Sequence, residues 1–90
     1  MVKRACVIYR GSVQGVGFRY TARSLAHGWN IAGYVKNLTD GSVELVAEGE
    51  QSEVSAFLAA VDSRMGELVR SREAKWSDAT GEFRGFALRF

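Results

Sequence analysis

The stretch GSVQGVGFR at residues 11–19 determines how the chain on either side of it can fold. It contains three glycines and one arginine and comes directly before a segment with helical spacing of apolar residues. Glycine adopts positive φ at little cost, so this stretch, the glycine loop, can curl until successive backbone N–H groups point into one concavity. A helix that starts here adds its own free N–H groups and the positive end of its dipole. The glycine loop therefore predicts a strand-to-helix turn that binds an anion.

Arg19 ends the glycine loop with a planar guanidinium that can donate to two phosphate oxygens at once. A tight connection with a surface arginine would have the same local composition, and this alternative stays open on the loop alone. The spacing of Gly11, Gly15 and Gly17 is not that of a dinucleotide-binding motif, and no Gly-Lys-Ser/Thr follows. The pattern thus favours a site for one phosphate group rather than for a nucleotide.

The segments around the glycine loop alternate between strand and helix patterns. Residues 5–10 form a short β-branched and aromatic run typical of a buried strand. Residues 18–29 place apolar side chains on one helical face, and Gly28 is expected near the helix end. Residues 31–36 and 42–48 are predicted strands around an Asp-Gly turn. In the second of these strands, apolar residues alternate with more polar ones, as expected of a half-buried strand.

The rest of the chain predicts one more helix and two more strands. Ser52 is expected to cap the helix and Gly66 to end it, and apolar residues at helical spacing lie between them. An extended segment follows Leu68, and residues 86–90 form a clear alternating strand. This order indicates an α+β fold: a ferredoxin-like split βαβ sandwich, with two helices over one face of a mostly antiparallel sheet and a short additional C-terminal strand.

Size and composition limit the possible functions. Ninety residues make one domain, 1–90, of ordinary globular composition. No apolar run is long enough to cross a bilayer, and no signal-peptide core follows the first residues. Cys6 is the single cysteine, so neither an internal disulfide nor a cysteine-built metal site is possible. We expect a cytoplasmic monomer without a membrane partner, a metal or a cofactor.

Charge is unevenly distributed along the chain, although the net charge is only +2. The first 39 residues hold six basic and no acidic side chains, whereas residues 40–63 hold six acidic and no basic ones. The basic half contains the glycine loop, which suits an anionic ligand. Chance segregation of solvated charges is the alternative. The positive excess is too small for a typical nucleic-acid surface, so no nucleic-acid partner is expected.

Asn37 stands where a predicted strand meets its turn, in the stretch GYVKNLTDGSV at residues 33–43. An asparagine at such a place is usually a turn residue. In a split βαβ fold, the strand before the glycine loop and the strand that carries Asn37 can be sheet neighbours. Asn37 could then lie near the anion site and orient a water molecule with its carbonyl and NH₂ groups.

Both stretches resemble the two motifs of the acylphosphatase family, and the resemblance covers essentially all 90 residues. It implies hydrolysis of the carboxyl–phosphate bond of small acyl phosphates to a carboxylate and inorganic phosphate, without metal or cofactor. It also implies that the backbone amides of the loop and Arg19 hold the phosphate and that Asn37 orients the attacking water. The implied phosphate-binding residues are Gln14, Gly15, Val16, Gly17, Phe18 and Arg19.

No general base is evident in the sequence. His27 is the sole histidine and lies near the far end of the first predicted helix, so we expect a surface or partly packed side chain. Hydrolysis of an acyl phosphate needs little general acid or base catalysis, because the carboxylate leaves without a proton and phosphoryl transfer depends mainly on positioning and charge neutralisation.

Three alternatives remain at this stage. Residues 84–90 begin like an RNA-binding RNP1 motif, but Leu88 stands where a stacking aromatic residue belongs, and the position is C-terminal rather than internal. The domain could instead be one module of a larger carbamoyl-phosphate-processing protein; a chain that starts and ends with the domain favours a free-standing enzyme. The third alternative is an anion-binding protein without turnover, and the presence of both Arg19 and Asn37 disfavours it.

Overall fold

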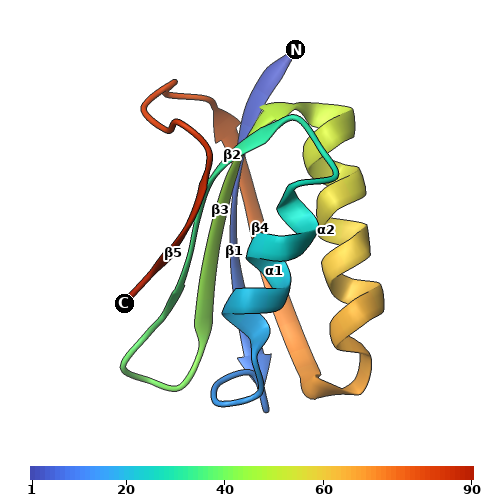
Figure 1. The fold of residues 1–90 in the computed structure, drawn as a ribbon, viewed down its shortest axis with the longest axis vertical. Coiled ribbons are helices and arrows are strands. Elements are labelled where there is room, and N and C mark those ends of the chain that lie inside the picture. Colours follow the sequence, from blue (N-terminus) through green and yellow to red (C-terminus); the bar gives the residue numbers. More distant parts are fainter.

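The computed structural model describes all 90 residues as one twisted sheet with two helices (Figure 1). The strands are β1 (Val2–Gly11), β2 (Ile31–Asn37), β3 (Val43–Glu50), β4 (Val69–Asp78) and β5 (Phe86–Arg89). The helices are α1 (Phe18–Ala26) and α2 (Gln51–Met65), and a short 3₁₀ helix, Gly66–Leu68, follows α2. This order confirms the predicted split βαβ fold, including the additional C-terminal strand.

The sheet has the strand order β4-β1-β3-β2-β5. All neighbouring pairs are antiparallel except β2 and β5, which run parallel. The strand before the glycine loop and the strand that carries Asn37 are therefore not neighbours, contrary to one expectation from the sequence. β3 pairs with both and separates them, because the β2–β3 hairpin inserts β3 beside β1.

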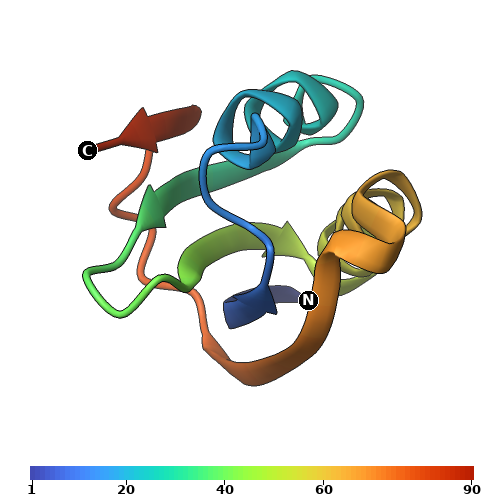
Figure 2. The ribbon, with the colours of Figure 1, turned by 90° about the horizontal axis from the view of Figure 1, so that it is seen from below.

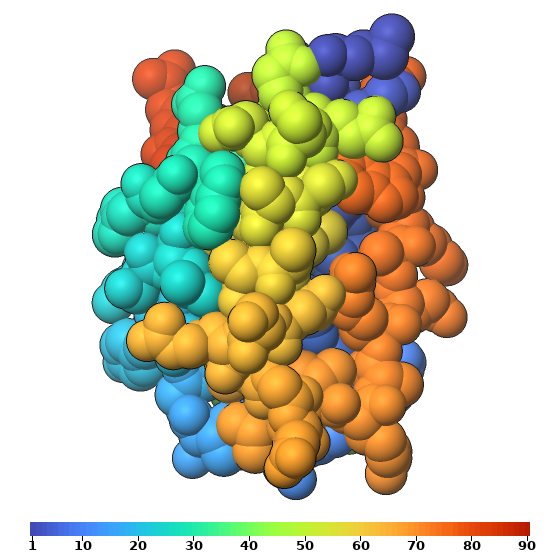
Figure 3. All heavy atoms as spheres, turned by 90° about the vertical axis from the view of Figure 1, so that its right-hand side faces the viewer, coloured from blue at the N-terminus to red at the C-terminus, as the bar shows by residue number.

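Both helices lie on the same side of the sheet and cover the core, as the view from below shows (Figure 2). α2 packs between α1 and β4 on this side (Figure 3). The core is a single cluster of sixteen buried residues, to which the predicted apolar faces of both helices contribute. From α1 these are Phe18, Ala22 and Ala26, and from α2 they include Val54, Phe57 and Val61. Burial of each large apolar side chain contributes about 1.5–3 kcal/mol to stability, and these contributions hold both helices against the sheet.

One helix end differs from the sequence-based expectation. The N-cap of α2 is Glu50 rather than Ser52, and it makes no side-chain capping bond. β3 leads into α2 without a loop, and the Gln51 amide donates instead to the carbonyl of Met1 at 3.1 Å. The other ends agree: α1 ends at Ala26 with His27 as its C-cap, so Gly28 directly follows the helix, and Gly66 caps α2.

Glu48 on β3 is buried, although strand alternation predicts it on a solvated face. Only 5% of its surface is exposed, because residues 79–85 fold across this end of the sheet. Its carboxylate accepts hydrogen bonds from Arg4 Nε at 2.8 Å, from the amide and hydroxyl of Thr80 at 2.9 and 3.0 Å, and from the Gly81 amide at 3.0 Å. This network attaches the chain between β4 and β5 to the sheet.

The Glu48 network makes stability depend on pH. Burial alone would raise the pKa of Glu48, but the hydrogen bonds from Thr80, Gly81 and Arg4 together lower it below its ordinary value of 4.5. A lowered native pKa stabilises the fold above the unfolded-state pKa, and this stabilisation is lost as pH falls through the native pKa. We expect Glu48→Gln to lower the free energy of unfolding by about 2 kcal/mol at pH 7. The deficit should shrink at pH 3.

Chemical denaturation of both proteins at the two pH values measures the effect. Glu73→Gln is the matched control, since Glu73 is exposed on the edge strand β4. A Glu48→Gln deficit of equal size at pH 7 and pH 3 would show that the ionised carboxylate is not responsible.

Candidate phosphate-binding site

The glycine loop leaves β1 and crosses the end of the sheet to reach α1 (Figure 2). Gly15 and Gly17 have φ values of 75° and 79°, in the left-handed region that other residues rarely adopt. Gly17 is the N-cap of α1, and its carbonyl accepts the first helical hydrogen bond from the Thr21 amide at 2.9 Å. The two glycines therefore turn the chain directly into the helix, as the sequence predicts.

The backbone amides of residues 15–20 donate no hydrogen bond within the protein. They belong to the tight part of the loop and to the first turn of α1, where the positive end of the helix dipole also lies. Free N–H groups at a helix N-terminus bind phosphate and other anions.

Arg19, in the first turn of α1, is held by the end of β5. Its Nη1 donates to the carbonyl of Arg89 at 3.0 Å, and its guanidinium carbon lies 4.9 Å from the ring centre of Phe90. The side chain makes no ion pair with a carboxylate. Its remaining N–H donors are therefore free for an anion.

Asn37 ends β2, in the sheet layer beneath α1. Its Oδ1 is buried and has no hydrogen-bond partner. A buried acceptor without a partner costs about 1–3 kcal/mol, so a hydrogen bond from a bound water or ligand would stabilise this oxygen.

The Gln14 side chain links the loop to the hairpin that carries Asn37. Its Nε2 donates to the carbonyls of Leu38 at 2.7 Å and Ser42 at 2.8 Å. The two motifs therefore lie together although β3 separates their strands. The family resemblance implies only a backbone role for Gln14, and no sequence signal pointed to this side-chain link.

One cavity of about 150 Å³ joins the two motifs. Its lining includes Arg19 and Asn37 together with loop and helix residues: Val13, Gly15, Gly17, Phe18 and Tyr20. Of the predicted phosphate-binding residues, Gln14 and Val16 do not line it. Tyr20 lines it and was not predicted, because an aromatic residue after the motif arginine has no obvious role in the sequence alone.

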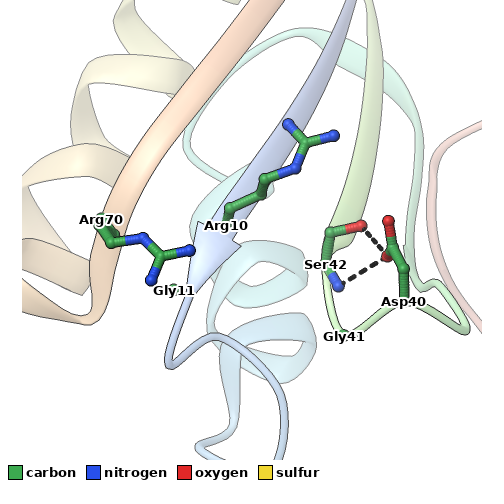
Figure 4. Close-up of a pocket in the computed structure, with 6 residues that line it drawn as sticks. All are labelled: Arg10, Gly11, Asp40, Gly41, Ser42 and Arg70. Atoms are coloured by element: carbon green, nitrogen blue, oxygen red, sulfur yellow. Dashed lines mark hydrogen bonds between the residues drawn. The ribbon is translucent and has the colours of Figure 1, made fainter.

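A second cavity, of about 170 Å³, lies between Arg10, Arg70 and the β2–β3 turn (Figure 4). In this turn, Asp40 accepts hydrogen bonds from the amide and the hydroxyl of Ser42. These bonds lower the pKa of Asp40. They close the turn that holds Gln14, while the two arginines place further positive charge near the loop.

Other candidate residues lie away from the site. His27 is exposed beyond the end of α1. Phe86, the first of the two aromatic residues in the RNP1-like stretch, packs against Phe57 of α2 at 5.3 Å between ring centres and is not presented for base stacking. No group of three or more potential metal-ligating side chains occurs in the structure. No helix is long and apolar enough to cross a membrane.

The positive φ of Gly15 gives a direct test of the glycine loop. A Cβ at Gly15 would meet no atom within 4 Å, so Gly15→Ala acts only through its positive φ. A left-handed alanine costs about 1–2 kcal/mol, and we expect phosphate affinity to fall about fivefold or more. Gly81 has the same φ of 75° and the same open surroundings, far from the loop, so Gly81→Ala is the matched control. Calorimetric titration with inorganic phosphate measures both, and equal affinities would show that loop curvature does not matter.

The fold and the site together define a small α+β domain in which free backbone amides, an arginine and an unpartnered asparagine oxygen meet at one cavity. A family model described as acylphosphatase matches residues 5–88. The chain is 42% identical to an acylphosphatase of Roseiflexus sp. over 94% of its length and 92% of that protein. It is 39% identical to an acylphosphatase of Salinibacter ruber over 97% and 93%. The chain belongs to the acylphosphatase family, an enzyme family of hydrolases.

Solved structures agree with this membership. The acylphosphatase of Bacillus subtilis superimposes with a TM-score of 0.86 at 32% identity, with 100% of each chain covered. A HypF protein of T. kodakarensis superimposes with a TM-score of 0.83 at 33% identity, but 98% of this chain covers only 12% of that one. The same domain thus also occurs inside a much longer protein.

Proposed function

We propose that this chain hydrolyses the carboxyl–phosphate bond of small acyl phosphates through the cavity that joins the two motifs. The observation that carries the proposal is the meeting of three elements in that cavity: free amides at the N-terminus of α1, the unpaired donors of Arg19, and the unpartnered Oδ1 of Asn37. The first two match the oxygens of a phosphoryl group, and the third matches a water molecule.

In the proposed reaction, the amides of the glycine loop and Arg19 hold the three phosphoryl oxygens. A water molecule donates a hydrogen bond to Asn37 and attacks phosphorus. As the new P–O bond forms, the bond between phosphorus and the acyl oxygen breaks, and the carboxylate leaves with the electron pair. The proton of the water passes to a phosphoryl oxygen of the substrate. The products are a carboxylate and inorganic phosphate.

A site with so few groups can supply a large acceleration of hydrolysis. A millionfold acceleration requires about 8 kcal/mol. A preorganised donor aimed at developing charge contributes about 2.7–4 kcal/mol. Two or three loop amides and Arg19 reach this total if their hydrogen bonds strengthen toward the transition state. General acid catalysis would add little, because a carboxylate leaves unprotonated.

The test is hydrolysis of benzoyl phosphate in the presence of a chelator, with inorganic phosphate as inhibitor. We expect saturable release of one phosphate per benzoate and competitive inhibition by phosphate, because substrate and product share the loop. Absence of turnover by the folded protein would refute the proposal. We expect the 90 residues to act as one domain and a monomer in the cytoplasm, without a metal, nucleic-acid or membrane partner.

The T. kodakarensis HypF protein carries this fold within a much longer chain, which supports a second candidate: the module of a larger carbamoyl-phosphate-processing protein that the sequence left open. The same assay with carbamoyl phosphate separates the two. Turnover of both substrates favours a general acylphosphatase, whereas turnover of carbamoyl phosphate alone favours the specialised module.

A further inference from the structure

We infer that Tyr20 forms the subsite for the acyl group of the substrate and selects acyl phosphates with an aromatic or apolar acyl group. The inference rests on the proposed function and concerns the part of the substrate that the glycine loop and Arg19 do not hold. Tyr20 lines the phosphate cavity, yet 57% of its surface is exposed. An aromatic side chain that is both exposed and part of a ligand cavity is available to contact the ligand.

The geometry of phosphoryl transfer places the acyl group. Attacking water and leaving group lie roughly in line on opposite sides of phosphorus. Asn37 stands at the end of β2 in the sheet layer, so the water approaches from the sheet side of the cavity. The acyl oxygen must then leave on the side away from the sheet.

Tyr20 lies on this outer side. Phe18, Ala22 and Ala26 point into the core, and successive residues of a helix are about 100° apart. Tyr20, two residues after Phe18, therefore points away from the sheet at the mouth of the cavity. Val16 of the glycine loop is also an exposed apolar side chain at this end of α1, 44% exposed. Val16 does not line the cavity itself, so the exposed aromatic surface where the leaving group emerges is that of Tyr20.

The Tyr20 ring is also held in place. The guanidinium carbon of Arg23 lies 5.3 Å from its ring centre, one helical turn further along α1. A cation at this distance stabilises the position of an exposed ring. A ring that is positioned before binding loses less entropy when it contacts a substrate.

A larger cavity beside Asn37 is the competing place for the acyl group. It has a volume of about 530 Å³ and is lined by Lys36, Asn37, Leu38, Thr39, Asp40 and Phe90. It opens from the Asn37 side, so an acyl group there would lie beside the attacking water rather than opposite it. In-line geometry therefore favours the Tyr20 side of the cavity as the place of the acyl group.

The experiment compares kcat/KM for benzoyl phosphate and acetyl phosphate in the unaltered protein, Tyr20→Ala and Tyr20→Phe. We expect Tyr20→Ala to reduce the benzoyl-to-acetyl preference about fivefold, the effect of losing one aromatic contact. Tyr20→Phe should keep the preference, because it keeps the ring. The inhibition constant of inorganic phosphate should stay the same in both variants, since phosphate does not reach the subsite.

Three results would overturn the inference. One is an unchanged preference in Tyr20→Ala. Another is a parallel loss for both substrates and for phosphate, which would mean that Tyr20 only supports the loop. The third is a loss of preference in Phe90→Ala with none in Tyr20→Ala, which would place the acyl group in the larger cavity. Failure of the unaltered protein to hydrolyse either substrate would instead refute the proposed function itself.

Discussion

Replacing Arg19 by glutamine should reduce kcat/KM for acyl phosphates by about 1,000-fold or more, the effect of removing an arginine that neutralises a phosphoryl transition state. Arg19→Lys should lose nearly as much. A lysine keeps the charge, but it cannot donate two parallel hydrogen bonds, and the carbonyl of Arg89 is positioned for a guanidinium. Both variants should stay folded, because Arg19 lies outside the buried core.

Steady-state hydrolysis of benzoyl phosphate, with circular dichroism as a check of folding, measures the loss. Arg84→Gln is the matched control, since Arg84 is an exposed arginine in the segment between β4 and β5. Substantial activity in folded Arg19→Gln would show that the guanidinium does not bind the transferred group.

Replacing Asn37 by alanine should lower kcat about 100-fold, within the range for loss of one preorganised hydrogen-bonding group. Binding of inorganic phosphate should change little, because the loop amides and Arg19 remain. The reason lies in the buried Oδ1 of Asn37, which has no partner in the protein and loses its proposed water in the variant. A loss confined to kcat identifies a group that acts on the reaction rather than on ground-state binding.

The measurement is kcat together with the inhibition constant of inorganic phosphate. Asn30→Ala is a suitable control, because Asn30 is an exposed asparagine before the other end of β2. Equal losses in kcat and in phosphate affinity would mean that Asn37 shapes the loop and does not orient water.

Sequence patterns were sufficient for the order of the elements. Apolar spacing of 3.6 residues located both helices. A β-branched run, an Asp-Gly turn and, in residues 42–48 and 86–90, alternation located the strands. The two motifs also marked the glycine loop and Asn37. These features depend on short stretches of chain, and local sequence specifies them well.

The remaining features arise from contacts between distant segments. Gln14 reaches carbonyls 24 and 28 residues away, and Arg19 contacts Arg89 and Phe90 at the other end of the chain. Glu48 is buried only because residues 79–85 fold across it. The spacing of apolar residues in the sequence does not predict such contacts. The wrong expectation that β1 and β2 are neighbours has the same origin, since strand order depends on which hairpin inserts between them.

A crystal structure of the protein with orthovanadate, a mimic of the phosphoryl group under attack, tests the central claim most directly. The account predicts vanadate in the cavity of Arg19 and Asn37, with its equatorial oxygens on the loop amides and the guanidinium. One apical oxygen should contact Asn37 and the other should face Tyr20. Vanadate bound instead between Arg10 and Arg70, with the loop amides empty, would contradict the account.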